Sequence, residues 1–149
     1  PDRSVHLAAD EMHFPNGTVI TPDGATLIVG ESLGGCLTAF DIGAGGSLGN
    51  RRIWAPLEGV APDGICLDEA GHVWVANALA PEVICVAEGG AVVRRVATSQ
   101  NCYACMLGGD DGRTLFAVTA PASNHDDATR GRNGKIEVCT VDRPRAGLP

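Results

Sequence analysis

The chain has 149 residues, a net charge of −7, 44% hydrophobic residues, 20 glycines and 9 prolines. An acidic chain lacks the basic face that a phosphate backbone requires, which argues against nucleic acid as a partner. No apolar run approaches the length of a membrane span, so we expect no membrane partner. Short apolar runs separated by many Gly and Pro residues are typical of strands joined by tight turns. The sequence therefore predicts an all-β fold.

A repeated unit organises the chain. Its first copy opens with Pro-Asn-Gly and its second with Pro-Asp-Gly, and aligning Gly17 with Gly64 and Ala104 gives periods of 47 and 40 residues. Such periods, with about four short strands each, are typical of propeller blades. We expect three antiparallel four-stranded blades, at approximately 14–55, 62–97 and 103–142.

The two ends of the repeat array predict an incomplete ring. Residues 142–149 are too broken by Pro and Gly for a fourth strand of the last blade, and the run 4–9 precedes the first blade as a strand without a partner. We interpret 4–9 as the last strand of a preceding blade. Three blades cannot close a ring, and their open edges would pair with other strands. Residues 1–149 are therefore expected to form half of a six-bladed β-propeller, completed by a missing N-terminal half or by a second copy.

The six cysteines are interpreted mainly as packing residues. Cys66, Cys85 and Cys139 lie in apolar strand-like runs, where a free thiol behaves as a small hydrophobic side chain. Cys102 and Cys105 have the spacing of zinc and redox sites, but no second ligand pair follows at the distance that a zinc site needs. Zinc and redox chemistry stay open as alternatives to packing. Free cysteines favour a cytoplasmic location.

Six stretches of the sequence form a recognisable set: Phe14–Gly17, Leu37–Ile42, Asn50–Arg52, Pro62–Asp68, Cys105–Gly109 and Val141–Pro149. Together they resemble the C-terminal half of the gluconolactonase/regucalcin (senescence-marker-protein) family. Two Pro-Asn/Asp-Gly motifs that open successive blades are more specific than either motif alone. The resemblance implies descent from a divalent-metal-dependent lactonase, a carboxylic-ester hydrolase that opens a small-molecule sugar lactone.

The resemblance also implies a metal site on the propeller axis. It maps Asn16 and Asp63 onto two of the family's oxygen ligands, and it makes Asp63 the catalytic general base. Hard oxygen donors favour calcium, with zinc, magnesium or manganese as alternatives. Such a metal would polarise the lactone carbonyl and help Asp63 to activate water. The remaining ligands would lie in the missing half.

Topology adds three candidate substrate-binding residues. If the innermost strand starts at the mouth of the propeller, the next strand ends there, which brings Ser32 and Asn77 to the face of Asn16 and Asp63. Tyr103 takes the position of Asp63 in the third blade, where it could line the pocket. A capped strand end or simple packing is the structural alternative for each residue.

The remaining candidates have plainer interpretations. The polar stretch 123–134 is expected to be a solvated loop, with a lid over the pocket as the alternative. His13 is expected to be a solvent-facing loop residue, and no function is expected of His72. The alternative to a lactonase is a non-catalytic half-propeller that acts as a binding or assembly module.

Overall fold

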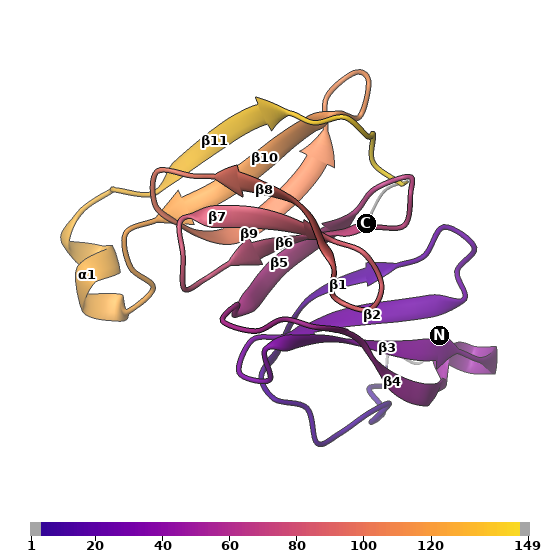
Figure 1. Ribbon diagram of the computed structural model, residues 1–149. Helices are drawn as coiled ribbons and strands as arrows, with labels where there is room; N and C mark the ends of the chain where they lie inside the picture. Colours follow the sequence, from indigo (N-terminus) through magenta and orange to yellow (C-terminus); the bar gives the residue numbers. More distant parts are fainter. Residues whose placement is uncertain (1–3, 147–149) are drawn as a thin grey trace.

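The computed structural model describes residues 4–146, which form an all-β structure of three antiparallel sheets and one short helix (Figure 1). The first sheet has the strand order β1-β2-β3-β4, the second β5-β6-β7-β8 and the third β9-β10-β11. The bounds are β1 Pro15–Ile20, β2 Thr26–Glu31, β3 Cys36–Ile42, β4 Leu48–Pro56, β5 Pro62–Leu67, β6 Val73–Asn77, β7 Glu82–Val86, β8 Val92–Ala97, β9 Asn101–Gly108, β10 Thr114–Ala120 and β11 Lys135–Thr140.

The second sheet is the buried centre of the structure. Strands β6 and β7 are almost entirely apolar and buried, as expected for strands covered on both faces. One face packs against the first sheet, in a core that includes Ile28, Leu37 and Ile84. The other face packs against the third sheet, in a core that includes Trp74 and Leu115. The layers thus follow the order of the chain.

The first strand of each sheet lies beside the first strand of the next, so that β5 lies between β1 and β9. Glycine makes this approach possible. A Cβ atom on Gly17 would lie 2.3 Å from the backbone oxygen of Asp63, and one on Gly64 would lie 2.7 Å from Cα of Ala104. Neither distance is tolerable, so both positions require glycine to let neighbouring backbones touch. The glycines of the two opening motifs therefore lie within strands, where they set the spacing between sheets.

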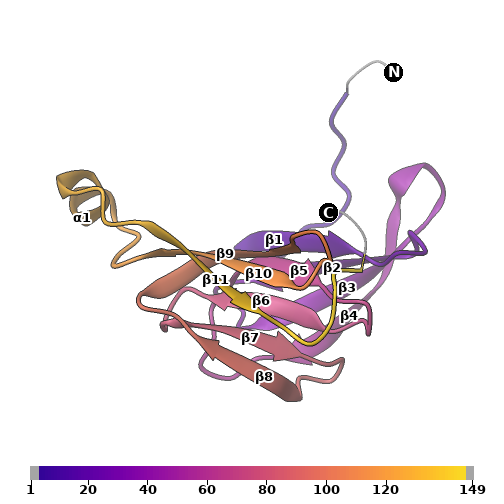
Figure 2. The same ribbon diagram turned by 90° about the horizontal axis from the view of Figure 1, so that it is seen from above.

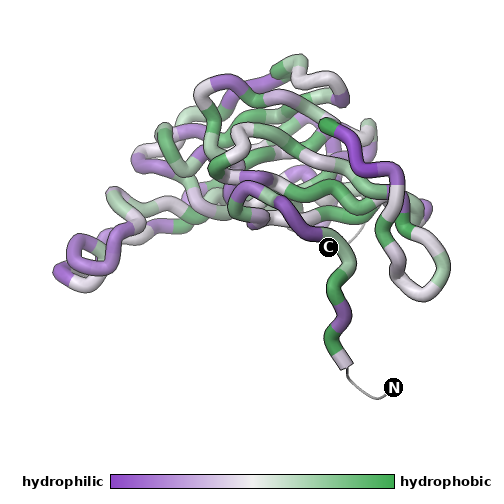
Figure 3. The backbone as a smooth tube through the Cα atoms, turned by 90° about the horizontal axis from the view of Figure 1, so that it is seen from below, coloured by the Kyte–Doolittle hydropathy of each residue, from purple (hydrophilic) through white to green (hydrophobic). Residues whose placement is uncertain are grey.

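The third sheet and the segment 4–9 match the predicted four-stranded blades only in part. The third sheet has three strands in the described chain, and residues 142–146 add only an isolated bridge between Asp68 and Arg145. Residues 4–9 form no strand and project from the body of the molecule (Figures 2 and 3). The predicted strand 4–9 would thus need a sheet from outside residues 4–146. Residues 1–3 and 147–149, which the predicted partial propeller also includes, lie outside the described residues.

The predicted polar loop contains a short helix, α1 (His125–Arg130), between β10 and β11. Asn124 caps it by accepting a hydrogen bond from the backbone N–H of Asp127. No residue of α1 is buried, and the helix projects beyond the sheets with a hydrophilic surface (Figures 2 and 3). Within residues 4–146, no helix has the length and apolar character needed to cross a membrane.

All six cysteines are free thiols. Cys66, Cys85, Cys102 and Cys105 are buried in the core between the second and third sheets, and the half-buried Cys139 packs against it. The expectation that these cysteines pack as small hydrophobic residues is confirmed.

Candidate metal and substrate site

Asn16 and Asp63 lie side by side at the starts of two adjacent strands. Each is the second residue of its strand, β1 or β5, and the Asn16 side chain lowers the pKa of the neighbouring Asp63 carboxyl group. The amide nitrogen of Asn16 donates to the hydroxyl oxygen of Ser32. This orientation leaves the amide oxygen of Asn16 and carboxylate lone pairs of Asp63 available to a cation.

The electrostatic environment of Asp63 favours a cation. Partial burial raises the pKa of the Asp63 carboxyl group above its ordinary value, and the Asn16 side chain offsets part of this effect. Within the described chain, no basic side chain contributes to this pKa. A carboxyl group whose pKa is perturbed by burial is a candidate functional residue.

Ser32 adjoins this pair. Its hydroxyl group donates to the backbone oxygen of Pro62 at 2.6 Å and lies 3.4 Å from the donating amide nitrogen of Asn16. Ser32 therefore ties the end of β2 to the start of β5 and orients Asn16. Its only proton is used in this contact, and hydrogen bonding to substrate through its oxygen stays a prediction.

Asn77 has a structural environment. Its side chain is buried, with 1% of the residue exposed. Its oxygen accepts hydrogen bonds from the backbone N–H groups of Ala61 and Leu79, at 3.3 and 3.1 Å, and its nitrogen donates to Glu82 at 3.0 Å. These bonds hold two loops at the mouth end of the second sheet. The geometry favours this role over the predicted contact with substrate.

Tyr103 lies on the other side of Asp63. It is a half-buried residue of β9, and its backbone oxygen would be 3.2 Å from a Cβ atom on Gly64. The third sheet thus brings Tyr103 against the strand that carries Asp63. Its role in lining a pocket stays a prediction.

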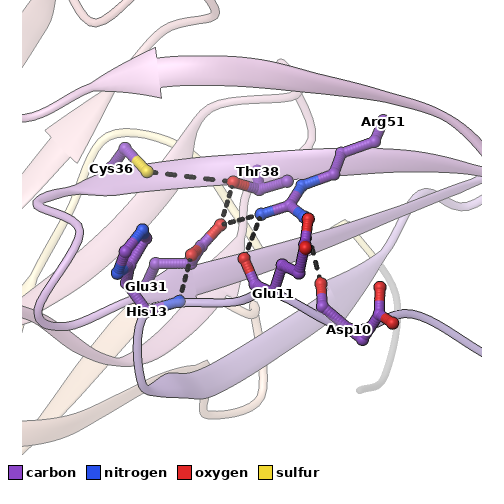
Figure 4. Close-up of polar contacts among 7 residues, drawn as sticks. All are labelled: Asp10, Glu11, His13, Glu31, Cys36, Thr38 and Arg51. Carbon is purple, nitrogen blue, oxygen red and sulfur yellow. Dashed lines mark hydrogen bonds and ion pairs between the residues drawn. The ribbon is translucent and has the colours of Figure 1, made fainter.

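A buried carboxylate holds the chain that leads into β1 (Figure 4). Glu31, 1% exposed, accepts a hydrogen bond from the backbone N–H of His13 at 2.6 Å and one from the hydroxyl group of Thr38 at 2.5 Å. Arg51 lies 3.5 Å from the same carboxylate and donates to the backbone oxygens of Asp10 and Glu11. Burial alone would raise the pKa of Glu31, but these hydrogen bonds and the Arg51 charge together lower it.

We call Glu31 and Arg51, with their hydrogen-bond partners, the Glu31–Arg51 clamp. It holds a strained backbone next to Asn16. Phe14 has a φ of +59°, an unfavourable conformation for a bulky residue that precedes proline. Hydrogen bonds from the backbone N–H groups of Ser32 and Leu33 to the oxygens of Phe14 and His13 maintain it. Sequence reasoning did not assign Glu31 and Arg51 this role. The one available signal was a carboxylate at the end of the apolar run of β2.

A hollow of about 540 Å³ lies beside Ser32. The loops β2–β3 and β4–β5 and the side chain of Leu79 form its walls. These loops are at the same end of the sheets as Asn16 and Asp63, because antiparallel strands return to the same edge. The hollow therefore lies at the mouth end of the structure, although neither Asn16 nor Asp63 is among its lining residues.

Comparison with known proteins identifies the family. A family model described as SMP-30/Gluconolactonase/LRE-like region matches residues 1–121. The chain belongs to this family. The resemblance seen in the opening motifs is thereby confirmed.

The relatives are about twice as long as the chain or longer. Regucalcin from Gallus gallus is 31% identical over 134 residues, which cover 80% of this chain and 42% of that protein. A solved gluconolactonase from Xanthomonas campestris is 28% identical with a TM-score of 0.66, covering 78% of this chain and 38% of that one. A calcium-binding regucalcin from Agrobacterium tumefaciens is 20% identical with a TM-score of 0.74, covering 97% of this chain and 53% of that one. The chain thus spans about half of the length of its SMP-30/gluconolactonase relatives, or less.

Proposed function

We propose that the chain forms half of a six-bladed propeller and supplies Asn16 and Asp63 to the metal site of a sugar-lactone hydrolase. The adjacency of Asn16 and Asp63, each the second residue of one of two neighbouring inner strands, is the observation that carries this proposal. Related proteins include a gluconolactonase and a calcium-binding regucalcin, which supports a lactone as the substrate and calcium as the metal. Six free thiols favour a cytoplasmic location.

The surface of the third sheet supports the half-propeller. Phe116 pairs with Val138 and Val118 with Ile136 across β10 and β11, and all four side chains are exposed. A contiguous apolar face on a sheet is expected to be covered by another layer. The next blade of a propeller would cover it, supplied by the missing half or by a second copy. Val5 and Leu7 are similarly exposed, in the segment expected to complete a preceding blade.

The donor set at the mouth fits a hard divalent cation. Amide and carboxylate oxygens are the ligands that calcium and magnesium prefer, and zinc or manganese also accept them. When bound, the metal would act as a Lewis acid on the lactone carbonyl. Two protein ligands leave several positions to the other half of the ring.

The chain's own residues would perform the proton transfer. Asp63 accepts the proton of the attacking water, and its raised pKa makes it a better base than an ordinary carboxylate. The Asn16 amide lies beside the carboxylate and acts on its pKa, and Ser32 orients Asn16. The Glu31–Arg51 clamp fixes the backbone that leads to Asn16.

A non-catalytic half-propeller that pairs with another half is the second candidate. It is favoured by the incomplete donor set and by the structural use of the Asn77 side chain. Asp63 would then stabilise an assembly through a shared cation. Activity in a completed ring separates the two functions.

The test is ring opening of glucono-1,5-lactone, measured by acid release. The chain is assayed over a range of concentrations, alone and with the N-terminal half of a family lactonase, with calcium, zinc, magnesium or manganese. Turnover is expected to require metal, and Asp63→Asn is expected to lower it at least roughly a hundredfold. Asp41→Asn, which removes an exposed carboxylate paired with Arg52, is the matched control and should retain activity. Full turnover by Asp63→Asn would contradict the catalytic assignment, and no turnover in any setting would support the non-catalytic module.

A further inference from the structure

Three metal-ligand side chains meet at the end of the second sheet that is opposite to Asp63. Asp68 follows the last residue of β5, His72 precedes the first residue of β6, and Cys85 is the fourth residue of β7. Asp63 and Asp68 are five residues apart, which corresponds to roughly 16 Å along a strand. The cluster is therefore separate from the proposed catalytic site, and the proposed function uses none of its members.

The three side chains are close enough to share one ion. One ligand atom of each lies within 4.8 Å of the other two. Nδ1 of His72 is 3.5 Å from Oδ2 of Asp68, and Sγ of Cys85 is 3.9 Å from the same oxygen. A tetrahedral zinc ion with bonds of about 2.0–2.3 Å places its ligand atoms about 3.3–3.6 Å apart. Small side-chain movements would complete this geometry.

The fold fixes the orientation of the carboxylate. Oδ1 of Asp68 accepts hydrogen bonds from the backbone N–H groups of Ala70 and His72, at 2.9 and 3.0 Å. Oδ2 is thereby directed to the imidazole of His72 and the thiol of Cys85. A ligand held by hydrogen bonds in this way needs little reorganisation when a metal binds.

The space around the cluster can hold the ion and a fourth ligand. Asp68, His72 and Cys85 line a hollow of about 250 Å³, together with Trp74, the cross-strand neighbour of Cys85. Trp74 is 2% exposed, and its indole Nε1 is buried without a hydrogen-bond partner in the described chain.

Two arginines line the hollow together with the buried carboxylate of Asp68. Arg94 is paired with Asp142, and the charge of the exposed Arg143 acts on Cys85. A cation that binds Cys85 displaces the thiol proton to solvent.

We propose that Asp68, His72 and Cys85 bind one divalent transition-metal ion, with Zn²⁺ as the best match and water in the fourth position. A set of one sulfur, one nitrogen and one oxygen ligand suits zinc, whereas calcium and magnesium prefer oxygen ligands alone. Three protein ligands with one open position are typical of zinc sites that bind an exogenous molecule.

Cobalt titration of the 149-residue chain tests the site, because Co²⁺ reports sulfur ligation by a thiolate-to-metal charge-transfer band. We expect this band at one equivalent of Co²⁺ and its loss when Zn²⁺ is added. Cys85→Ser should abolish the band, and His72→Ala should weaken Co²⁺ binding at least roughly tenfold. His72 lies in a turn with 22% of its side chain exposed, so the second variant should fold even if the first does not.

Two controls separate this site from others. Cys36→Ser removes a thiol of the first sheet and should leave the band unchanged. Asp63→Asn should also leave it unchanged, since the site at Asn16 and Asp63 has only oxygen ligands. If the chain gives no sulfur band, or if the band survives Cys85→Ser, the three side chains are only a hydrogen-bonded turn and the proposal is wrong.

Discussion

At the scale of single residues, two carboxylates near the mouth of the structure have opposite environments. Glu31 is buried with two hydrogen-bond donors and the Arg51 charge, and its pKa is lowered. Asp63 is half-buried beside one amide, and its pKa is raised. The environment of Glu31 stabilises its ionised form and thereby the fold. The environment of Asp63 does not, which makes Asp63 a candidate for binding a ligand.

We predict that Asp63→Asn stabilises the chain at neutral pH in the absence of metal. A raised carboxyl pKa means that ionised Asp63 destabilises the folded state above that pKa, and this effect vanishes as pH falls below the ordinary value. The gain should be less than about 1 kcal/mol, because water screens a half-exposed group. Urea unfolding at pH 7 and pH 3.5 measures it. A loss of stability at pH 7 would show that Asp63 has a structural partner after all.

We predict the opposite result for Glu31→Gln. Its lowered pKa gives stability that is present above the ordinary pKa of a glutamate and is lost as pH falls through the folded value. The amide cannot accept from His13, Thr38 and Arg51 together, so unfolding at neutral pH should become easier by about 1–3 kcal/mol. Urea unfolding across pH 3–7 checks this, and the difference from the unmodified chain should shrink at the acid end. Glu58→Gln, at an exposed loop position, is the control.

At the scale of strands, glycines set the distance between sheets. Gly17 and Gly64 let β1, β5 and β9 touch through their backbones, and this contact places Asn16 beside Asp63. The opening motifs of the first two repeats therefore carry both the ligand residues and the packing that brings them together.

We predict that Gly17→Ala destabilises the chain by about 1–3 kcal/mol, because its methyl group would overlap the backbone of β5. Gly49→Ala, in β4, meets no atom within 4 Å and needs no positive φ, so it should be nearly neutral. Thermal unfolding of the two variants makes the comparison. Equal stability of both variants would mean that β1 and β5 are not in backbone contact.

The strands were predictable from the sequence, and the contacts between them were only partly so. Apolar runs that follow Gly-containing turns mark β2, β6 and β10 directly, because strand formation depends on local pattern. The repeat also predicted that Asn16 and Asp63 lie at the same end of adjacent sheets. The Glu31–Arg51 clamp joins residues 10–13 with β2, β3 and β4, and the Asp68–His72–Cys85 cluster joins two turn positions with β7. Such contacts depend on register and packing, which a single sequence does not specify. The short helix α1 was missed because its six residues, five of them polar, have no apolar periodicity.

At the scale of the whole molecule, the unsatisfied features lie at the two ends of the layered array. The third sheet exposes an apolar face, and the segment 4–9 extends from the first sheet's side of the structure without a strand partner among the described residues. In a closed propeller both features would be buried by further blades.

Self-association of the 149-residue chain is the consequence that can be measured. Ile136 and Val138 are 71% and 62% exposed on the apolar face of β11, so we expect the chain to associate as its concentration rises. The double change Ile136→Lys with Val138→Lys should reduce association at least tenfold, since it places two charges where a neighbouring blade would pack. Leu33→Lys, at an exposed apolar loop residue outside the third sheet, is the control and should leave association unchanged. Sedimentation velocity measures the association.

A discrete dimer would indicate that two copies complete the ring. Open-ended aggregation would indicate that a different half is needed. A monomer at every concentration would contradict the half-propeller, because it would show that the apolar face of the third sheet is stable in water.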